Sequence, residues 1–182
     1  AMAMAGCGSY SKVEGFGFLP ITSFSMALTT FIGQNLGAKQ YDRARKGARF
    51  GVIVCVLLSE LVGVAINLAA PLLIGAFDSA PEVIYYGTLQ ARTVTLFYFL
   101  LSFSHCVAGV LRGAGKSVVP MLVMMVCWCL IRITYIVIVV PIAQNIQAIF
   151  WAYPLTWALS SIIFLIYYFK ADWVHGYERR RT

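Results

Sequence analysis

Residues 33–49, GQNLGAKQYDRARKGAR, crowd basic side chains into a short segment between two long apolar runs. The segment contains a single acid, Asp42. Such a segment is typical of a short connection between two membrane-spanning helices, provided that the flanking runs are long enough to cross a bilayer. The five bases are Lys39, Arg43, Arg45, Lys46 and Arg49.

The composition also indicates a membrane protein. Hydrophobic residues make up 60% of the 182 residues and charged residues 12%. Soluble domains have about 45–50% on a closely similar apolar set and about 25% charged residues. A helix needs roughly 20 mostly apolar residues to cross a hydrocarbon core of about 30 Å. Five runs meet that length, and they cover residues 16–36, 50–77, 83–111, 118–142 and 146–169.

We therefore predict an all-α, polytopic membrane bundle of five transmembrane helices. Helices satisfy their own backbone hydrogen bonds in lipid, and the strict alternation of barrel strands is absent from these runs. Residues 1–15 are interpreted as a lead-in outside the membrane and residues 170–182 as a basic tail. The start lacks the basic and apolar parts of a signal peptide. Since five spans are an odd number for a symmetric transporter, we expect the chain to be part of a longer protein.

The basic residues predict the orientation of the bundle. The first and third connections and the tail are basic, whereas the second and fourth connections carry no base. Lys and Arg stay on the cytoplasmic side of membranes, so the start should lie outside and the C-terminus inside, with residues 33–49 in a cytoplasmic loop. The net charge of +7 is then an orientation signal, and we expect no nucleic-acid binding. The later bases are Arg112, Lys116, Lys170, Arg179, Arg180 and Arg181.

Three charged residues inside the predicted spans are candidates for transport or ion coupling. Glu60 lies about 16 Å from the basic face and Arg132 roughly 24 Å, at 1.5 Å per helical residue. Two interpretations stay open: Glu60 and Arg132 form a structural ion pair, or Glu60 carries protons during transport. Arg92, near the outer end of its span, either snorkels to the interface or contacts an anionic group in a cavity.

Small and polar residues at the predicted cytoplasmic span ends are candidates for helix packing or for a hinge. Glycines four residues apart allow close helix approach, and the two amides are expected to bind backbone rather than substrate. A proline inside the fifth span is expected to kink it. These candidates are Gly33, Gln34, Asn35, Gly37, Gly109, Gly113 and Pro154.

No enzyme signature occurs in the sequence, so we expect neither a catalytic residue nor an enzymatic activity. LRGAGKS, residues 111–117, ends like a phosphate-binding loop, but its first glycine is too close to the lysine. Cys127 and Cys129 would point about 200° apart around a helix and cannot hold one metal ion. We expect no metal site and no cofactor.

Two segments together resemble the multidrug and toxic compound extrusion (MATE) family. They are FIGQNLGAKQYDRARKG, residues 31–47, and VLRGAGKSVVPM, residues 110–121, which stand in the family's order two spans apart. They resemble the connections after its eighth and tenth helices, and CWCLIRITYIVIVVP, residues 127–141, resembles its eleventh helix. The resemblance covers nearly the whole chain and is strongest to bacterial members.

The resemblance implies twelve helices in two six-helix lobes with cytoplasmic termini, in the plasma membrane, the inner membrane of a bacterium. This chain would supply helices eight to twelve, so the N-terminal lobe and the seventh helix would be missing partners. The family exports cationic and other amphiphilic small molecules by alternating access, in exchange for sodium ions or protons. This chain would therefore be part of a drug or organic-cation antiporter, with the lipid bilayer as its environment.

One departure from the family concerns the coupling ion. Some members have a cation-binding carboxylate in the tenth helix, but residues 83–111 contain no acid, and Glu82 precedes them. The C-lobe cation site is therefore not carried over, and coupling would depend on the missing lobe or on Glu60. Two alternative functions stay open: a flippase for lipid-linked oligosaccharides with related architecture, and a non-transporting membrane scaffold.

Overall fold

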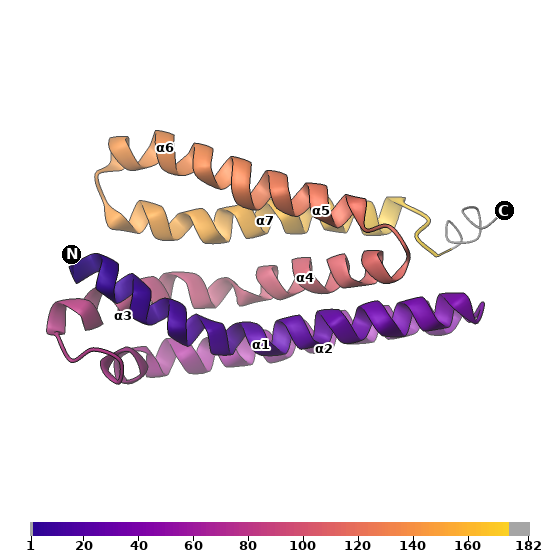
Figure 1. The fold of residues 1–182 in the computed structure, drawn as a ribbon, viewed down its shortest axis with the longest axis horizontal. Coiled ribbons are helices and arrows are strands. Elements are labelled where there is room, and N and C mark those ends of the chain that lie inside the picture. Colours follow the sequence, from indigo (N-terminus) through magenta and orange to yellow (C-terminus); the bar gives the residue numbers. More distant parts are fainter. Residues whose placement is uncertain (1, 175–182) are drawn as a thin grey trace.

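Five helical spans lie side by side in the computed structural model of the protein, which describes residues 2–174 (Figure 1). Three spans are continuous helices: α1 (Met2–Gly37), α2 (Tyr41–Gly75) and α7 (Ile146–Lys170). The other two are interrupted, and they run from Pro81 to Gly113 and from Val118 to Ala143. The predicted all-α bundle of five spans is confirmed.

The interruptions divide the third and fourth spans into shorter helices. A 3₁₀ turn separates α3 from α4, and a π-helical segment separates α5 from α6. Neither interruption contains glycine or proline, the usual helix breakers, so contacts with neighbouring helices have to hold them. The bounds are α3 Pro81–Val94, 3₁₀ turn Thr95–Phe97, α4 Tyr98–Gly113, α5 Val118–Met124, π segment Met125–Ile131 and α6 Arg132–Ala143.

The basic stretch is mostly helical, which corrects the predicted cytoplasmic loop. Only residues 38–40 separate α1 from α2, and the arginines at 43, 45 and 49 lie on the first turns of α2. Ala44 and Ala48 are fully buried on the same turns, so packing against the bundle extends the helix beyond the apolar run. At the other end of α1, the helix begins at Met2 and takes in most of the predicted lead-in. The membrane boundaries themselves stay a prediction.

The three basic segments share one end of the bundle. The α1–α2 turn, the α4–α5 turn and the end of α7 lie together at the right of Figure 1, opposite the N-terminus. This is the arrangement that the predicted orientation requires. Arg179, Arg180 and Arg181 of the predicted tail lie outside the described residues.

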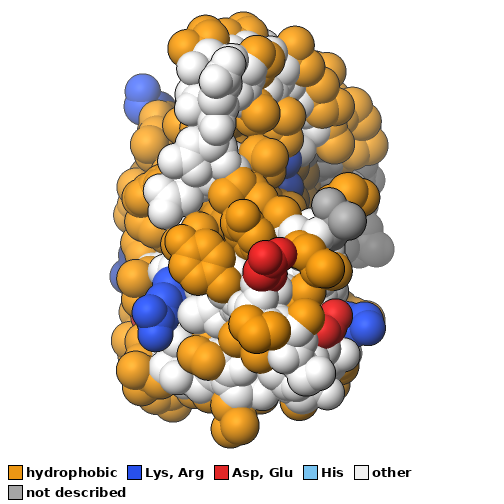
Figure 2. All heavy atoms as spheres, turned by 90° about the vertical axis from the view of Figure 1, so that its left-hand side faces the viewer, with side chains coloured by type: hydrophobic (Ala, Val, Ile, Leu, Met, Phe, Trp, Pro, Cys, Tyr) orange, Lys and Arg blue, Asp and Glu red, His pale blue; other side chains and the backbone are white. Residues whose placement is uncertain are grey.

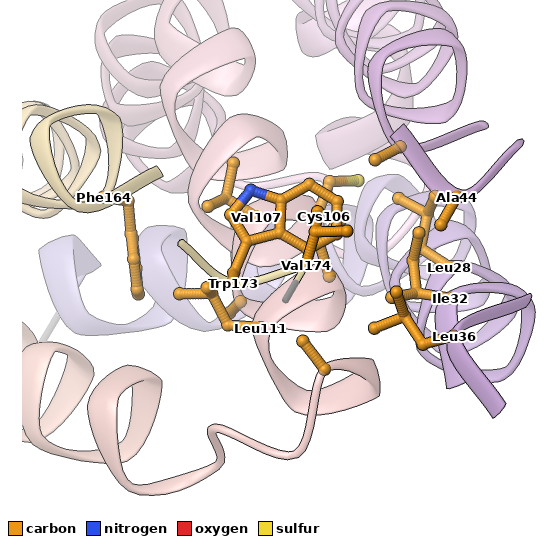
Figure 3. Packing of buried hydrophobic residues seen from close by; sticks show 14 of the residues in the cluster. Leu28, Ile32, Leu36, Ala44, Cys106, Val107, Leu111, Phe164, Trp173 and Val174 are labelled. Atoms are coloured by element: carbon orange, nitrogen blue, oxygen red, sulfur yellow. The ribbon is translucent and has the colours of Figure 1, made fainter. Parts of the chain in front are cut away.

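Helices α1 and α2 pack closely with each other and with both α3 and α4, and α7 packs on α4 and α3. The α5–α6 span lies outermost, against α7. Two buried hydrophobic clusters fill the bundle, one toward the basic end and one around Tyr10, Tyr98 and Trp157. In the first, the Trp173 ring lies among Val107 and Leu111 (Figure 3).

Large apolar side chains also cover the outside of the bundle, as expected of a surface that meets lipid. On α2, an outward stripe is 66–78% exposed. Figure 2 looks onto the end that holds the N-terminus, where hydrophobic side chains again cover most of the surface. The stripe consists of Leu57, Leu61, Leu68 and Leu72.

Candidate functional site

A polar cluster joins four helices in the half of the bundle remote from the basic end. Helix α1 contributes Tyr10 and Glu14, which lie one turn apart and so share a face. Tyr98 is the first residue of α4, and Arg132 is the first residue of α6. Tyr153 and Thr156 of α7 complete what we call the Glu14–Arg132 cluster.

Hydrogen bonds and a ring contact hold the cluster together. The hydroxyl oxygens of Tyr10 and Tyr98 are 3.2 Å apart, and both side chains are fully buried. Arg132 donates from Nη2 to Thr156 Oγ1 at 2.8 Å, and its guanidinium carbon lies 4.4 Å from the centre of the Tyr153 ring. The hydroxyls of Tyr10 and Tyr98 thus pair with each other, whereas the Tyr153 ring faces a cation.

Glu14 is the acid of the cluster. It interacts with the Tyr10 hydroxyl and with the charge of Arg132. Arg132 Nε is buried and has no hydrogen-bond partner among the described residues. A half-buried acid and base surrounded by aromatic rings can neutralise each other, and either can also accept another ion.

Glu14 was not predicted from the sequence, because residues 1–15 were interpreted as a lead-in outside the membrane. The missed signal is the helical spacing of Tyr10, Val13, Gly17 and Ile21, all of which are buried on α1. That spacing continues the apolar face of the first span back past Glu14.

Glu60 binds a helix end rather than Arg132. Its Oε2 accepts a hydrogen bond from the backbone N–H of Phe99, at 3.1 Å. Phe99 is the second residue of α4, so a carboxylate from α2 caps the helix that follows the 3₁₀ turn, where it meets the positive end of the helix dipole. The predicted Glu60–Arg132 ion pair is wrong for the described residues. Residue spacing predicted only how deep each side chain lies along the helix axis. It did not predict the neighbouring helices, and α6 packs against α7 and not beside α2.

Asn67 binds the N-terminal side of the 3₁₀ turn that interrupts the third span. Its Nδ2 donates to Thr95 Oγ1 at 3.1 Å and to the Arg92 carbonyl oxygen at 3.4 Å. Between Asn67 and Glu60 stands Gly63, where an added Cβ would lie 2.6 Å from the Thr95 carbonyl oxygen. Glu60, Gly63 and Asn67 share one face of α2, and we call them the α2 clasp, because they hold the interrupted third span.

The Arg92 side chain is exposed and lines a hollow of about 370 Å³ with Pro71, Tyr85 and Thr88. Thr88 Oγ1 is buried there without a hydrogen-bond partner in the described part of the chain. Both interpretations of Arg92, snorkelling and contact with an anionic group, remain predictions.

The predicted packing glycines differ in how close their neighbours come. A Cβ at Gly109 would lie 2.5 Å from the Ser25 carbonyl oxygen, and one at Gly113 would lie 2.5 Å from that of Thr29. At Gly33 the nearest atom is 3.5 Å away, in Gly113, and at Gly37 the space is open. Glycine is therefore required where α4 crosses α1, at 109 and 113, but not at 37.

The remaining candidates lie in regular helix. Asn35 Nδ2 donates to the Phe31 carbonyl oxygen of its own helix at 2.7 Å, while the Gln34 side chain is exposed. Pro154 is buried within α7, which continues through it from Ile146 to Lys170. The predicted kink and the predicted hinge role remain predictions.

Serine hydroxyls join α4 to α7 without any charged group. Ser104 Oγ lies 3.0 Å from Ser160 Oγ and 2.9 Å from Ser161 Oγ. Trp128 Nε1, in the π segment, donates to Ser160 Oγ at 3.1 Å. These contacts fix the position of the π segment that precedes Arg132.

Known proteins match the chain at the levels of family and fold. The family model described as MatE matches residues 1–138. A probable multidrug resistance protein, NorM, from Thermotoga maritima is 32% identical over 123 residues, which are 68% of this chain and 26% of the relative. The multidrug and toxin extrusion protein 1 of Danio rerio is 22% identical over 82% of this chain and 26% of its own length.

Solved structures agree with the fold at low sequence identity. A MATE protein crystallised in complex with MaD3S superposes with a TM-score of 0.88 at 18% identity, over 96% of this chain and 40% of that one. An outward-facing multidrug resistance MATE family transporter of the MOP superfamily gives a TM-score of 0.85 at 20% identity, over 96% and 39%. The chain thus spans well under half the length of these relatives.

Proposed function

Because the chain belongs to the MatE family, the multidrug and toxic compound extrusion (MATE) transporters, we propose that it forms the C-terminal lobe of a two-lobed efflux antiporter. The transporter exports amphiphilic or cationic small molecules by alternating access, in exchange for sodium ions or protons, and it is not an enzyme. The observation that carries this proposal is the Glu14–Arg132 cluster, which places an acid, a base and three tyrosines together between the helices of a mainly apolar bundle.

The cluster has the chemistry that an organic cation needs. A carboxylate attracts the positive charge, and aromatic faces bind both the charge and the apolar body of such a molecule. Tyr153 already binds a cation in this way, since the guanidinium of Arg132 lies over its ring. A charged residue inside a membrane bundle is costly and is retained mainly where it has a function.

The same residues suggest how coupling works. The positive charge of Arg132 attracts the Glu14 carboxylate. A proton that converts Glu14 to the carboxylic acid, or a sodium ion bound to its oxygens, neutralises the charge of this carboxylate. While either ion occupies Glu14, an organic cation cannot pair with it, so the two compete for one carboxylate. Competition for one site makes exchange possible.

The other charged candidates have different roles in this proposal. Glu60 holds the interrupted third span through Phe99, and Arg92 lies at the outer end of that span. The basic ends of the helices face the cytoplasm of a bacterial cell, and the N-terminal lobe covers the side of the cluster that this chain leaves open.

Substituting Glu14→Gln tests the proposal. In everted membrane vesicles that contain the full-length, two-lobed transporter, we expect ethidium transport driven by an imposed proton or sodium gradient to fall about tenfold or more, which corresponds to about 1.4 kcal/mol. The gradient that drives the unsubstituted protein identifies the coupling ion. Glu82→Gln, at the exposed start of α3, is the matched control and should transport normally. Normal transport by Glu14→Gln at equal membrane abundance would remove the cluster from the mechanism.

The two alternatives predict other results. A flippase for anionic lipid-linked sugars needs a strongly basic cavity, whereas this cluster contains one acid, Glu14, and one base, Arg132. A scaffold predicts no ethidium transport by the unsubstituted full-length protein under either gradient.

A further inference from the structure

The chain turns back after α7 and leaves a hollow of about 310 Å³ beside the start of α2. Ala171 leaves the helix in an extended conformation, and Trp173 N–H donates to the Ala171 carbonyl oxygen at 2.9 Å. Trp173 and Val174 are only 4% and 2% exposed, and Figure 3 shows both beside Leu111 in the core. The wall of the hollow is therefore anchored by packing. Its polar and aromatic lining consists of Arg45, Arg49, Tyr168, Lys170, Asp172 and Trp173.

The hollow is positively charged on balance. Arg45 and Arg49 lie one turn apart on α2 and point to the same side, and Lys170 faces them from the last turn of α7. Against these cations stand Asp172 and the C-terminal end of α7, whose dipole is equivalent to about half a negative charge. Lys116 Nζ also reaches this segment, at 3.3 Å from the Asp172 carbonyl oxygen. The cations outnumber the negative groups.

The apolar surroundings of the hollow fit a lipid. Tyr168 and Trp173 form an aromatic pair with ring centres 5.5 Å apart, as is common where helices leave the hydrocarbon. Arg49 is followed by Phe50, which is 71% exposed, and Lys170 is preceded by Phe169, which is 74% exposed. The cations would lie at the level of the lipid headgroups, and the exposed rings beside them would lie at the level of the acyl chains. This arrangement matches a molecule that is anionic at one end and apolar at the other.

We propose that this hollow is a binding site for the phosphate of an anionic phospholipid, held by Arg45, Arg49 and Lys170. Arginine binds phosphate oxygens through paired N–H groups, and basic pockets between spanning helices at a cytoplasmic surface recognise anionic headgroups. The bound lipid joins the start of α2 to the end of α7, two helices that are remote in the sequence. The proposal does not depend on transport, because it concerns the basic end of the bundle and not the Glu14–Arg132 cluster.

The test measures lipid retention by the purified protein. The protein in detergent is incubated with dioleoyl phosphatidylglycerol or dioleoyl phosphatidylcholine, and bound lipid is counted by native mass spectrometry over a concentration series. We expect phosphatidylglycerol to bind preferentially. Arg45→Gln/Arg49→Gln should weaken that binding roughly 30-fold. Each basic residue near an anionic headgroup contributes about fivefold in affinity, and the two contributions multiply.

The matched control, Arg43→Gln/Lys46→Gln, removes two charges from the same turns of α2 but not from this hollow, and it should retain the lipid. Equal losses in both double variants, or equal binding of phosphatidylcholine, would overturn the proposal. Inorganic phosphate is the third arm: full displacement of phosphatidylglycerol by millimolar phosphate would mean that a soluble anion is the occupant. If the arginine variant does not fold, Lys170→Gln at the exposed helix end replaces it, with an expected loss of about fivefold.

Discussion

The third and fourth spans are both apolar enough to cross a membrane, yet the protein buries them very differently. The most apolar window of the fourth span has the higher mean hydropathy, 2.5 against 1.8 for the third. Nevertheless α4, in the third span, has ten buried residues, whereas α6, in the fourth, has none. In Figure 1, α4 lies inside the bundle and α6 lies at its edge.

This difference shows that hydropathy reports solubility in lipid and not burial in protein. Lipid is as apolar as leucine, so an apolar helix gains little free energy when it moves from lipid into the protein interior. Small or hydroxyl-bearing residues are instead typical of the surfaces where membrane helices pack together. The third span has them in Ser102, Ser104 and Gly109, all buried. The fourth span is rich in Val and Ile, and its main polar anchor is Arg132, which reaches Thr156 of α7.

The largest effect should come from enlarging a packing glycine of the third span. Gly109→Leu forces a side chain against the Ser25 carbonyl oxygen and should cost about 3 kcal/mol of the free energy of unfolding. Thermal unfolding of the detergent-purified protein measures it. Val137→Leu on α6, 64% exposed, is the control and should be close to neutral. Equal stability of the two variants would mean that the helices do not cross as described.

Arg132 should be an exception to the expectation that substitutions in the fourth span cost little stability. It lies in the outermost span, but its side chain contacts a neighbouring helix. Arg132→Leu removes the bond to Thr156 and the attraction between the Arg132 charge and Glu14. Breaking a fully buried pair costs 3–5 kcal/mol, and since Arg132 is half-buried we expect about 2 kcal/mol. Adding Glu14→Gln should recover part of the loss in a double-mutant cycle. Strictly additive effects would show that the two residues do not interact.

The α2 clasp should account for a smaller share of the third span's stability. Glu60→Leu removes the cap of α4 and should cost about 1 kcal/mol, whereas Glu60→Gln keeps an acceptor for the Phe99 N–H and should cost less. Ethidium transport in Glu60→Gln separates capping from proton carriage. Retained transport supports the cap, and complete loss with normal insertion would restore the proton-carrier interpretation.

The smallest effect should come from the exposed face of the fourth span. Ile133→Ala, at a side chain that is 60% exposed, should change the free energy of unfolding by no more than about 0.5 kcal/mol. The same thermal unfolding assay applies. A cost above about 2 kcal/mol would indicate that another protein surface, and not lipid, covers this face.

Much of this arrangement could be predicted from the sequence. Run length predicted the five spans, which the structure confirms, and the spacing of Gly109 and Gly113 pointed to a close helix crossing that the structure contains. The interruptions could not be predicted, since no breaker residue marks Thr95–Phe97 or Met125–Ile131. Glu14 was missed because average hydropathy falls around Lys12 and Glu14, although the apolar face of the helix continues.

The sequence by itself determined how many times the chain crosses the membrane and which connections are basic, since both follow from local composition and from the length that a helix needs. Only the tertiary structure decided which polar residues meet. Glu60 caps the start of α4, Arg132 donates to Thr156 and lies over the Tyr153 ring, and Arg45 and Arg49 line a hollow together with the end of α7. The physical reason is that position along a helix fixes the depth of a side chain, whereas its partner depends on how the helices are ordered and rotated around one another.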